Sequence, residues 1–367
     1  MRRQFLRGPG LIRLVLQFAV SLALLTLLWR LVGGAEAARR LSTASPGWLL
    51  CAVAALTLQT YLSALRWQLT ARQVGIRIGT GPAIREYYLA QVVNQCLPGG
   101  VVGDAGRALR SRAQAGLVRA GQAVVFERAA GQLAMIALLG LAFVVTDALP
   151  GGLDWPPALA VPLRLLMGAG LGFLILCAML LRLPGPAGRI LSRALGPFRR
   201  SLGTGWVLLT QLVLSAGTVI CNLAAFWVCL RAVGAEMSFA AVCALVPLVL
   251  MTMVIPLTIS GWGMREGAAV ALLPLAGVAP SDALAGSVAF GLMILASVLP
   301  GAILPLLSGQ TSRPAMSARH ERPRRDRKPE PPVCAAPGRD TGYVTAPGLE
   351  TPPGASSLET STGRTRR

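Results

Sequence analysis

Residues 122–146 read QAVVFERAAGQLAMIALLGLAFVVT and decide the class of fold. Glu127 and Arg128 are the only charged residues in this mostly apolar stretch, and a helix of about 20 apolar residues crosses the hydrocarbon core of a bilayer. A charge at the bilayer centre costs about 2.5–3.5 kcal/mol, and adjacent helical side chains point about 100° apart. Glu127 and Arg128 therefore each need a partner from another segment. The candidate partners are Asp104, Arg107, Arg265 and Glu266.

Apolar runs of similar length recur along the chain. Ala35-Glu36-Ala37 resembles a signal cleavage site after the first run, but that run exceeds the usual 7–15 residues, so we expect an uncleaved first span. Residues 267–278 are apolar but too short to span, and suit a re-entrant segment. The pattern predicts an all-α polytopic membrane protein with about seven or eight transmembrane helices, one or two re-entrant segments and a disordered C-terminal tail. The other spans are expected at 14–32, 47–65, 161–181, 205–230, 239–260 and 283–307.

The composition excludes several classes of protein. Apolar residues make up 54% of the chain and charged residues 14%, against about 25% charged in a soluble domain. Lys328 is the only lysine and Pro329 follows it, so a Walker A loop, whose lysine precedes serine or threonine, is excluded. His320 is the only histidine, which excludes a zinc site built on paired histidines and disfavours a Ser-His-Asp triad. The seven cysteines show no metal-binding spacing, so we expect no metal or other cofactor.

The loop arginines predict the topology of the chain. If the N-terminus is inside, residues 1–13 and the loop regions within 66–119 and 182–200 hold most of these arginines. Cytoplasmic loops carry an excess of basic residues, so residues 1–13 are expected to be a cytoplasmic N-terminus. Topology then accounts for much of the net charge of +20, and no nucleic-acid partner is needed. The opposite side holds five arginines, namely Arg30, Arg39, Arg40, Arg164 and Arg231.

The last part of the chain, residues 309–367, changes character. It is rich in Pro, Arg, Ser, Thr and Gly and has almost no apolar periodicity. Such a segment buries too little apolar surface to offset its ordering entropy, so we expect a disordered basic tail after a membrane domain at 14–308. Its charge favours the cytoplasm, which requires residues 267–278 to span; if they are re-entrant instead, the tail lies on the opposite side. The tail is either free in solvent or held against anionic lipid.

Residues 83–110 form the first segment that carries chemistry. Residues 83–97 have an amphipathic helical pattern too polar to span, and Pro98 begins a Pro-Gly-Gly break. A helix is expected to restart near Asp104, a good N-cap. A glycine-rich turn before a helix N-terminus, with Arg107 nearby, suits the phosphate of an anionic lipid headgroup. An ordinary cytoplasmic loop with topology-setting arginines is the alternative.

The second such segment lies at residues 256–267. Pro256 disturbs the end of a span, and Gly261 and Gly263 permit a tight turn or close backbone approach. Arg265 and Glu266 then open the short apolar stretch. This pattern indicates either a broken helix lining a polar cavity or a plain interfacial loop. The Glu127–Arg128 pair likewise fits either a lipid site or a structural ion-pair network.

Together these segments resemble the lysylphosphatidylglycerol synthase transmembrane-domain family, also called flippase-like domain proteins, over roughly residues 12–308. The resemblance rests on an Asn-x-x-x-Pro motif with a following Gly-Asp and Arg, a Glu-Arg pair in the next span, and a late Pro-x-x-x-x-Gly-x-Gly-x-Arg-Glu motif. Apart from Pro256, we take the matching positions as substrate-binding candidates. These candidates are Asn94, Pro98, Gly103, Asp104 and Arg107, then Glu127 and Arg128, then Gly261, Gly263, Arg265 and Glu266.

The resemblance implies a multi-pass protein of the bacterial inner membrane with re-entrant segments around a central cavity. It also implies lipid handling, such as movement of aminoacylated phospholipid between leaflets, or a place in hopanoid or polyprenyl-linked glycolipid pathways. Two departures stand out. The acidic residue that often follows the Glu-Arg pair is replaced by residues 129–131, Ala-Ala-Gly. The soluble aminoacyl-transfer domain is not expected, so this chain should not make lysylphosphatidylglycerol by itself.

Three functions remain open at this point. A lipid translocase without its own ATPase would bind an anionic headgroup through Arg107, Arg128 and Arg265, with Glu127 and Glu266 balancing charge. A membrane enzyme, or a subunit of one, would modify a lipid or lipid-linked sugar, with Asp104, Glu127 or Glu266 as base; no catalytic residue is assigned, because no nucleophile–base pair is present. A scaffold would recruit partners through the tail. The partners expected are membrane lipid and a separate lipid-modifying enzyme.

Overall fold

The computed structural model describes residues 9–97, 100–148, 153–182, 185–255 and 257–307. Outside the described residues lie Pro98, Pro256, residues 1–8 of the cytoplasmic N-terminus expected at 1–13, and the tail expected at 309–367. These described residues are helical, with no β-strand among them. In chain order the helices are α1 (Pro9–Leu31), α2 (Gly34–Ser42), α3 (Pro46–Gln73), α4 (Thr80–Cys96), α5 (Val102–Ala115), α6 (Leu117–Ala148), α7 (Pro157–Arg182), α8 (Pro186–Leu202), α9 (Trp206–Ala232), α10 (Phe239–Met251), the 3-10 turn η1 (Thr252–Val254), α11 (Met264–Leu272), the 3-10 turn η2 (Leu273–Ala276) and α12 (Pro280–Leu307).

The predicted class, an all-α polytopic membrane protein, is confirmed. Across the described ranges, five helices are long and apolar enough to cross a membrane, namely α3, α6, α7, α9 and the Pro280–Gly301 part of α12. A sixth span is formed if α1 and α2 count together, although the chain bends by 95° between them. Gly33 makes this bend possible, because its backbone φ of 73° is readily adopted only by glycine.

Fewer full-length spans are found than the seven or eight expected. The run at 239–260 was predicted to span, but α10 ends at Met251 and continues only through the 3-10 turn η1. The backbone then enters a turn in which Ser260 has a φ of 51°. The stretch at 267–278 forms the short α11 and η2, and its length fits the predicted re-entrant segment. Residues 239–260 are apolar, as hydropathy indicates, but hydropathy does not predict where the helix ends within such a run.

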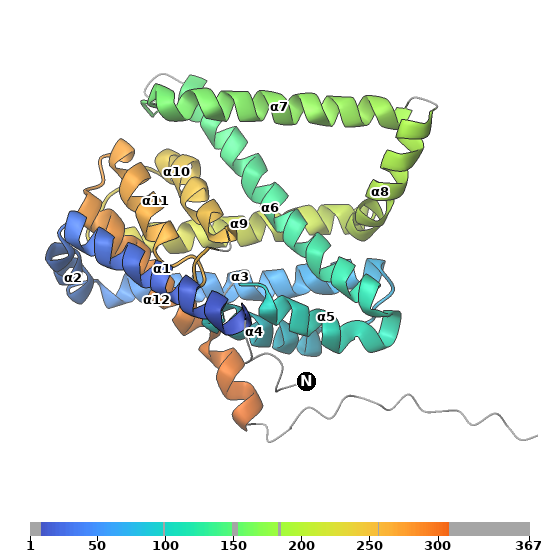
Figure 1. Ribbon diagram of the computed structural model, residues 1–367, viewed down its shortest axis with the longest axis horizontal. Helices are drawn as coiled ribbons and strands as arrows, with labels where there is room; N and C mark the ends of the chain where they lie inside the picture. The colour runs from blue at the N-terminus through green and yellow to red at the C-terminus, as the bar shows by residue number, and fades with distance from the viewer. Residues whose placement is uncertain (1–8, 98–99, 149–152, 183–184, 256, 308–367) are drawn as a thin grey trace, which may run out of the picture. The chain divides into compact units, whose positions relative to one another are not determined.

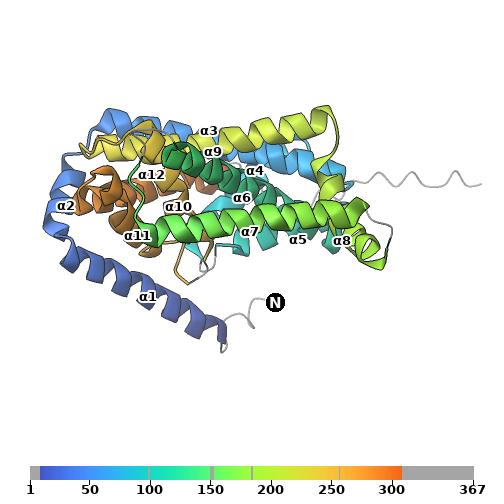
Figure 2. The ribbon, with the colours of Figure 1, turned by 90° about the horizontal axis from the view of Figure 1, so that it is seen from above.

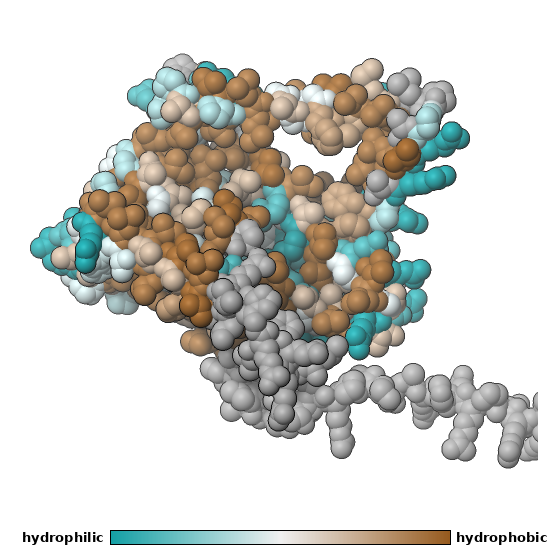
Figure 3. All heavy atoms as spheres, viewed as in Figure 1, coloured by the Kyte–Doolittle hydropathy of each residue, from teal (hydrophilic) through white to brown (hydrophobic). Residues whose placement is uncertain are grey.

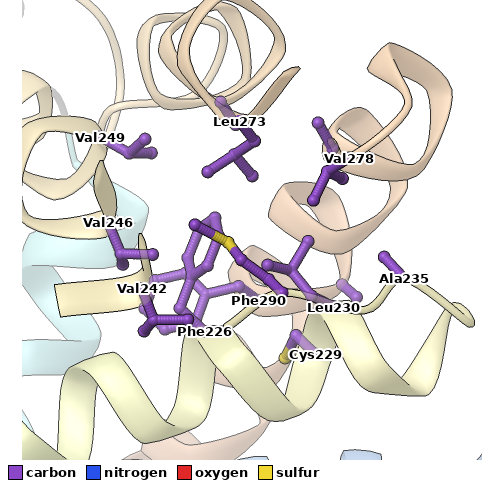
Figure 4. Close-up of a cluster of buried hydrophobic side chains, with 14 of the residues drawn as sticks. Phe226, Cys229, Leu230, Ala235, Val242, Val246, Val249, Leu273, Val278 and Phe290 are labelled. Atoms are coloured by element: carbon purple, nitrogen blue, oxygen red, sulfur yellow. The ribbon is translucent and has the colours of Figure 1, made fainter. Parts of the chain in front are cut away.

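The core of the molecule forms where α9, α10, α11 and α12 meet. α3 and α9 lie side by side along their length, as Figures 1 and 2 both show. Figure 4 shows the buried side chains of this core, with Phe226 from α9, Val246 from α10 and Phe290 from α12 turned toward one another. The rings of Phe226 and Phe290 contact each other with their planes tilted by 53° and their centroids 5.2 Å apart. This apolar core fixes the positions of the helices that carry the polar residues described next.

The outer surface is largely apolar, as expected for a protein solvated by lipid. Leu165, Leu171 and Phe173 on α7 are exposed by 61% or more. In Figure 3 hydrophilic residues gather at two ends, over α2 and over α5 and α8, with a hydrophobic band between them. This band fits the hydrocarbon core of a bilayer.

Candidate functional site

A buried carboxylate, Glu127, contacts side chains from three helices other than its own. It sits on α6, whose 32 residues span about 48 Å and so exceed the hydrocarbon thickness of about 30 Å. Its Oε1 lies 2.7 Å from Nη2 of Arg66 on α3, and its Oε2 lies 3.4 Å from Nη2 of Arg107 on α5. The hydroxyl of Tyr87 on α4 also donates to Oε1, at 3.4 Å. Burial raises the pKa of Tyr87, and the Glu127 carboxylate raises it further, so the phenol keeps its proton and remains a donor.

Arg107 is the most enclosed cation of this group. Its side chain has no exposed surface, and its guanidinium lies 4.5 Å from the ring centre of Trp67 and 4.6 Å from that of Tyr87. Nη2 donates to Oδ1 of Asp104 at 3.0 Å. Nε and Nη1 are buried without a hydrogen-bond partner among the described residues. Because two donors of this buried cation are unsatisfied, binding of a hydrogen-bond acceptor next to Arg107 would be favourable.

Arg128 links the group to the surface. Its Nη2 lies 2.8 Å from Oδ2 of Asp104, and 41% of its side chain is exposed. We call these five residues the Glu127 cluster: Arg66, Asp104, Arg107, Glu127 and Arg128. Three guanidinium groups face two carboxylates, so the cluster carries one positive charge in excess. A partly desolvated positive excess attracts an anion more strongly than the same charge in water.

The partners predicted for Glu127 and Arg128 are confirmed in part. Asp104 and Arg107 contact them, and the two neighbours do turn to different partners, as their 100° separation requires. Arg265 and Glu266 do not take part, because they pair with each other.

Asn94 and Gly103 position this cluster. The N–H of Gly103, in the first turn of α5, donates to Oδ1 of Asn94 at 2.7 Å. A side chain on Gly103 would overlap the carbonyl oxygen of Ala90, so glycine allows α4 and α5 to touch. The expectation that Asp104 caps α5 is wrong. The helix begins at Val102, and the Asp104 carboxylate is directed at arginines instead.

Arg265 and Glu266 form a second, separate ion pair in the first turn of α11. Both side chains are buried, and Arg265 Nη2 contacts Glu266 Oε1. Ser287 on α12 accepts from Arg265 Nε at 3.1 Å, and the Gly263 N–H donates to Glu266 Oε2 at 2.6 Å. The Arg265 guanidinium also lies 5.0 Å from the Trp262 ring centre. Because the pair is neutral and enclosed, it anchors the broken segment against α12.

The glycines of this broken segment behave as predicted from the sequence. Gly261 and Gly263 adopt φ values of 79° and 88°, which glycine reaches without strain. A Cβ on Gly263 would lie 2.7 Å from the Cβ of Leu24 on α1. The tight turn and the close backbone approach are therefore both present.

Sequence reasoning missed Arg66, which it assigned to a cytoplasmic loop. The structure places it inside α3, where its Nη1 also donates to Thr218 Oγ1 on α9 at 3.0 Å. A signal was available, because polar residues recur at helical spacing within two apolar runs and mark facing polar stripes. Gln211 on the second stripe donates to Thr70 on the first at 2.9 Å. The stripes are Thr60, Ser63, Arg66 and Thr70 on α3, and Gln211, Ser215, Thr218 and Asn222 on α9.

The family of the chain follows from its sequence match together with this architecture. Within the described residues, no group of three or more His, Cys, Asp or Glu side chains could hold a metal ion. A search of curated proteins found no match. The family model described as lysylphosphatidylglycerol synthase TM region matches residues 14–301, a range that contains both ion-pair groups. The chain therefore belongs to the lysylphosphatidylglycerol synthase TM region family, whose members are membrane proteins with lipid-related functions.

Proposed function

We propose that this chain moves an anionic or modified phospholipid, or a lipid-linked headgroup, between leaflets without an ATPase of its own. The observation that carries the proposal is the positive excess of the Glu127 cluster. The cluster lies among helices with an apolar outer surface, and Arg128 opens it to that surface. Fixed ion pairs alone would need only as many arginines as carboxylates.

In the proposed mechanism Arg128 receives the phosphate of the headgroup. Asp104 contacts both Arg128 and Arg107, so a phosphate that displaces Asp104 from Arg128 leaves this carboxylate paired with Arg107. Exchange of one anion for another avoids an uncompensated buried charge, which would cost several kcal/mol. The acyl chains remain in lipid while the headgroup crosses in contact with polar side chains.

The structure changes the roles expected for the other two arginines. Arg107 and Arg265 have almost no exposed surface, and each contacts a carboxylate. We therefore assign headgroup contact to Arg128, and positioning roles to Arg107 and Arg265. The alternative of a membrane enzyme is less favoured, since the carboxylates that would act as base already contact arginines. We further propose that the protein lies in the bacterial inner membrane with its N-terminus in the cytoplasm, as its arginines predict.

Arg128→Ala is expected to lower lipid translocation about tenfold while the protein stays folded. The variant removes a charge-assisted contact of about 1.5–3 kcal/mol to the headgroup, and Asp104 keeps its bond to Arg107. The assay reconstitutes the full chain with a fluorescent anionic phospholipid and follows bleaching by an impermeant reductant. Arg110→Ala is the matched control, because Arg110 is 40% exposed and also pairs with a carboxylate, Glu86. Equal rates for the wild type and Arg128→Ala would contradict the assignment. Bleaching that stops near half for the wild type, as in protein-free vesicles, would contradict translocation.

A further inference from the structure

A pocket of about 480 Å³ lies where α9 ends and α10 begins. It is lined by Arg231 at the end of α9, and by Glu236 and Ser238 before α10. Apolar side chains complete the wall, among them Leu153 and Met237. The pocket therefore combines one basic and one acidic side chain with an apolar part of its wall.

Arg231 is held in place by aromatic rings and has no acidic partner among the described residues. Its guanidinium lies 4.7 Å from the ring centre of Trp227 and 5.9 Å from that of Trp48. The rings restrict this long side chain, so less entropy is lost when it binds a ligand. No carboxylate lies within 4.0 Å of it in the described part of the chain. Its hydrogen-bonding edge is thus available for bidentate contact with an acceptor such as phosphate.

Glu236 is also without an ion pair in the regions that the structure describes, although it lines the same pocket. Both side chains are exposed at this open pocket, and the two opposite charges line it without pairing with each other. A simple anion would be repelled by Glu236, and a simple cation by Arg231. The ligand that satisfies both carries a negative and a positive group together.

The pocket lies at the C-terminal end of α9, whereas the Glu127 cluster contacts the middle of that helix, through Ser215 and Thr218. Arg231 follows Thr218, which contacts Arg66 of the cluster, by 13 residues, or about 20 Å along the helix axis. In Figure 1 α9 runs from α8 toward the end of the molecule where α2 lies. The arginine distribution assigns this end to the side opposite the N-terminus.

We propose that this pocket binds a zwitterionic phospholipid headgroup on the face opposite the N-terminus. Arg231 binds the phosphate and Glu236 the ammonium group, while the acyl chains stay in the surrounding lipid. The proposal deepens the translocase function and rests on it, because it names the class of lipid received or released at the second face. The anion site at the Glu127 cluster and this pocket then contact the same phosphate in turn.

Binding is measured first, independently of transport, by native mass spectrometry of the detergent-purified full chain. The probes are phosphatidylethanolamine and phosphatidylglycerol with identical acyl chains, so that only the ammonium group differs. Glu236→Gln is expected to lower retention of phosphatidylethanolamine relative to phosphatidylglycerol about fivefold, the effect of one exposed ion pair. Arg231→Gln is expected to lower retention of both lipids. Glu86→Gln removes a carboxylate at the opposite end and is expected to leave the ratio unchanged.

Translocation of acyl-labelled forms of the same two lipids is the second readout. Glu236→Gln should lower the rate for phosphatidylethanolamine and spare that for phosphatidylglycerol. A retention ratio that Glu236→Gln leaves unchanged overturns the pocket, whatever the transport rates are. If Glu236→Gln changes the retention ratio while the wild-type protein moves neither lipid, the pocket is supported and the translocase function is contradicted.

Discussion

Glu127→Ala is expected to destabilise the protein by about 3–5 kcal/mol. Glu127 has no exposed surface and contacts Arg66 and Arg107, which are also buried. Removing one partner of a buried ion pair leaves charge that neither water nor protein compensates. Among the described residues, Arg107 then keeps a hydrogen bond only to Asp104, and Arg66 only to the hydroxyl groups of Ser215 and Thr218. Unfolding monitored by heat or denaturant in a fixed detergent measures the loss.

The matched control for this variant is Glu86→Ala. Glu86 also pairs with an arginine, but the side chains of Glu86 and Arg110 are 29% and 40% exposed. Exposed pairs contribute about 0–1 kcal/mol, so this variant should unfold close to the wild type. Comparable stability losses in Glu127→Ala and Glu86→Ala would show that the Glu127 cluster is hydrated rather than enclosed.

Glu127→Gln separates charge from shape at the same position. The amide oxygen still accepts from Arg66 and Tyr87, but the cluster then has three positive charges against one negative charge. We expect a smaller stability loss than for alanine, because one hydrogen-bond acceptor is kept. This variant therefore tests whether the charge of Glu127 or its hydrogen bonding holds α3, α5 and α6 together.

The spans and the Glu127–Arg128 pair could be predicted because their physics is local in sequence. A long apolar run indicates a membrane span by its own length and composition, and a charge within the run indicates that this charge needs a partner. Which partner meets which charge depends on how helices pack, and that is not local. Asp104 and Arg107 could be proposed because they follow a conspicuous glycine-rich break, whereas Arg66, 61 residues before Glu127, stands at the end of an apolar run and was assigned to a loop.

The short α10 shows a different limit. The sequence at 239–260 is apolar enough to span, yet its helix ends at Met251. Where a helix stops inside such a run depends on whether other segments can satisfy the freed backbone groups. Here Ser21 on α1 accepts from the Ile259 N–H at 3.1 Å. That contact joins residues 238 positions apart, so hydropathy could not reveal it.

Gly103→Ala is expected to disrupt both the fold around the site and lipid translocation. The added Cβ would overlap the Ala90 carbonyl oxygen, which belongs to helix backbone and cannot rotate away. α5 must then move from α4, and the bond from the Gly103 N–H to Asn94 lengthens or breaks. Overpacking of this kind costs about 1–3 kcal/mol. Asp104 and Arg107 move with α5, so the translocation rate should fall further than stability alone would require.

Gly121→Ala adds the same methyl group but is expected to raise the stability of the protein rather than lower it. Gly121 lies within α6, and a Cβ there meets no atom within 4 Å. Alanine is favoured over glycine in a helix interior by about 0.5–1 kcal/mol, so this variant should unfold at a higher temperature than the wild type. If Gly103→Ala matched Gly121→Ala in stability, α4 and α5 would not be in contact at this point. A loss of translocation confined to Gly103→Ala would instead show that the position of α5, and with it the geometry of Asp104 and Arg107, sets the rate at which the headgroup crosses.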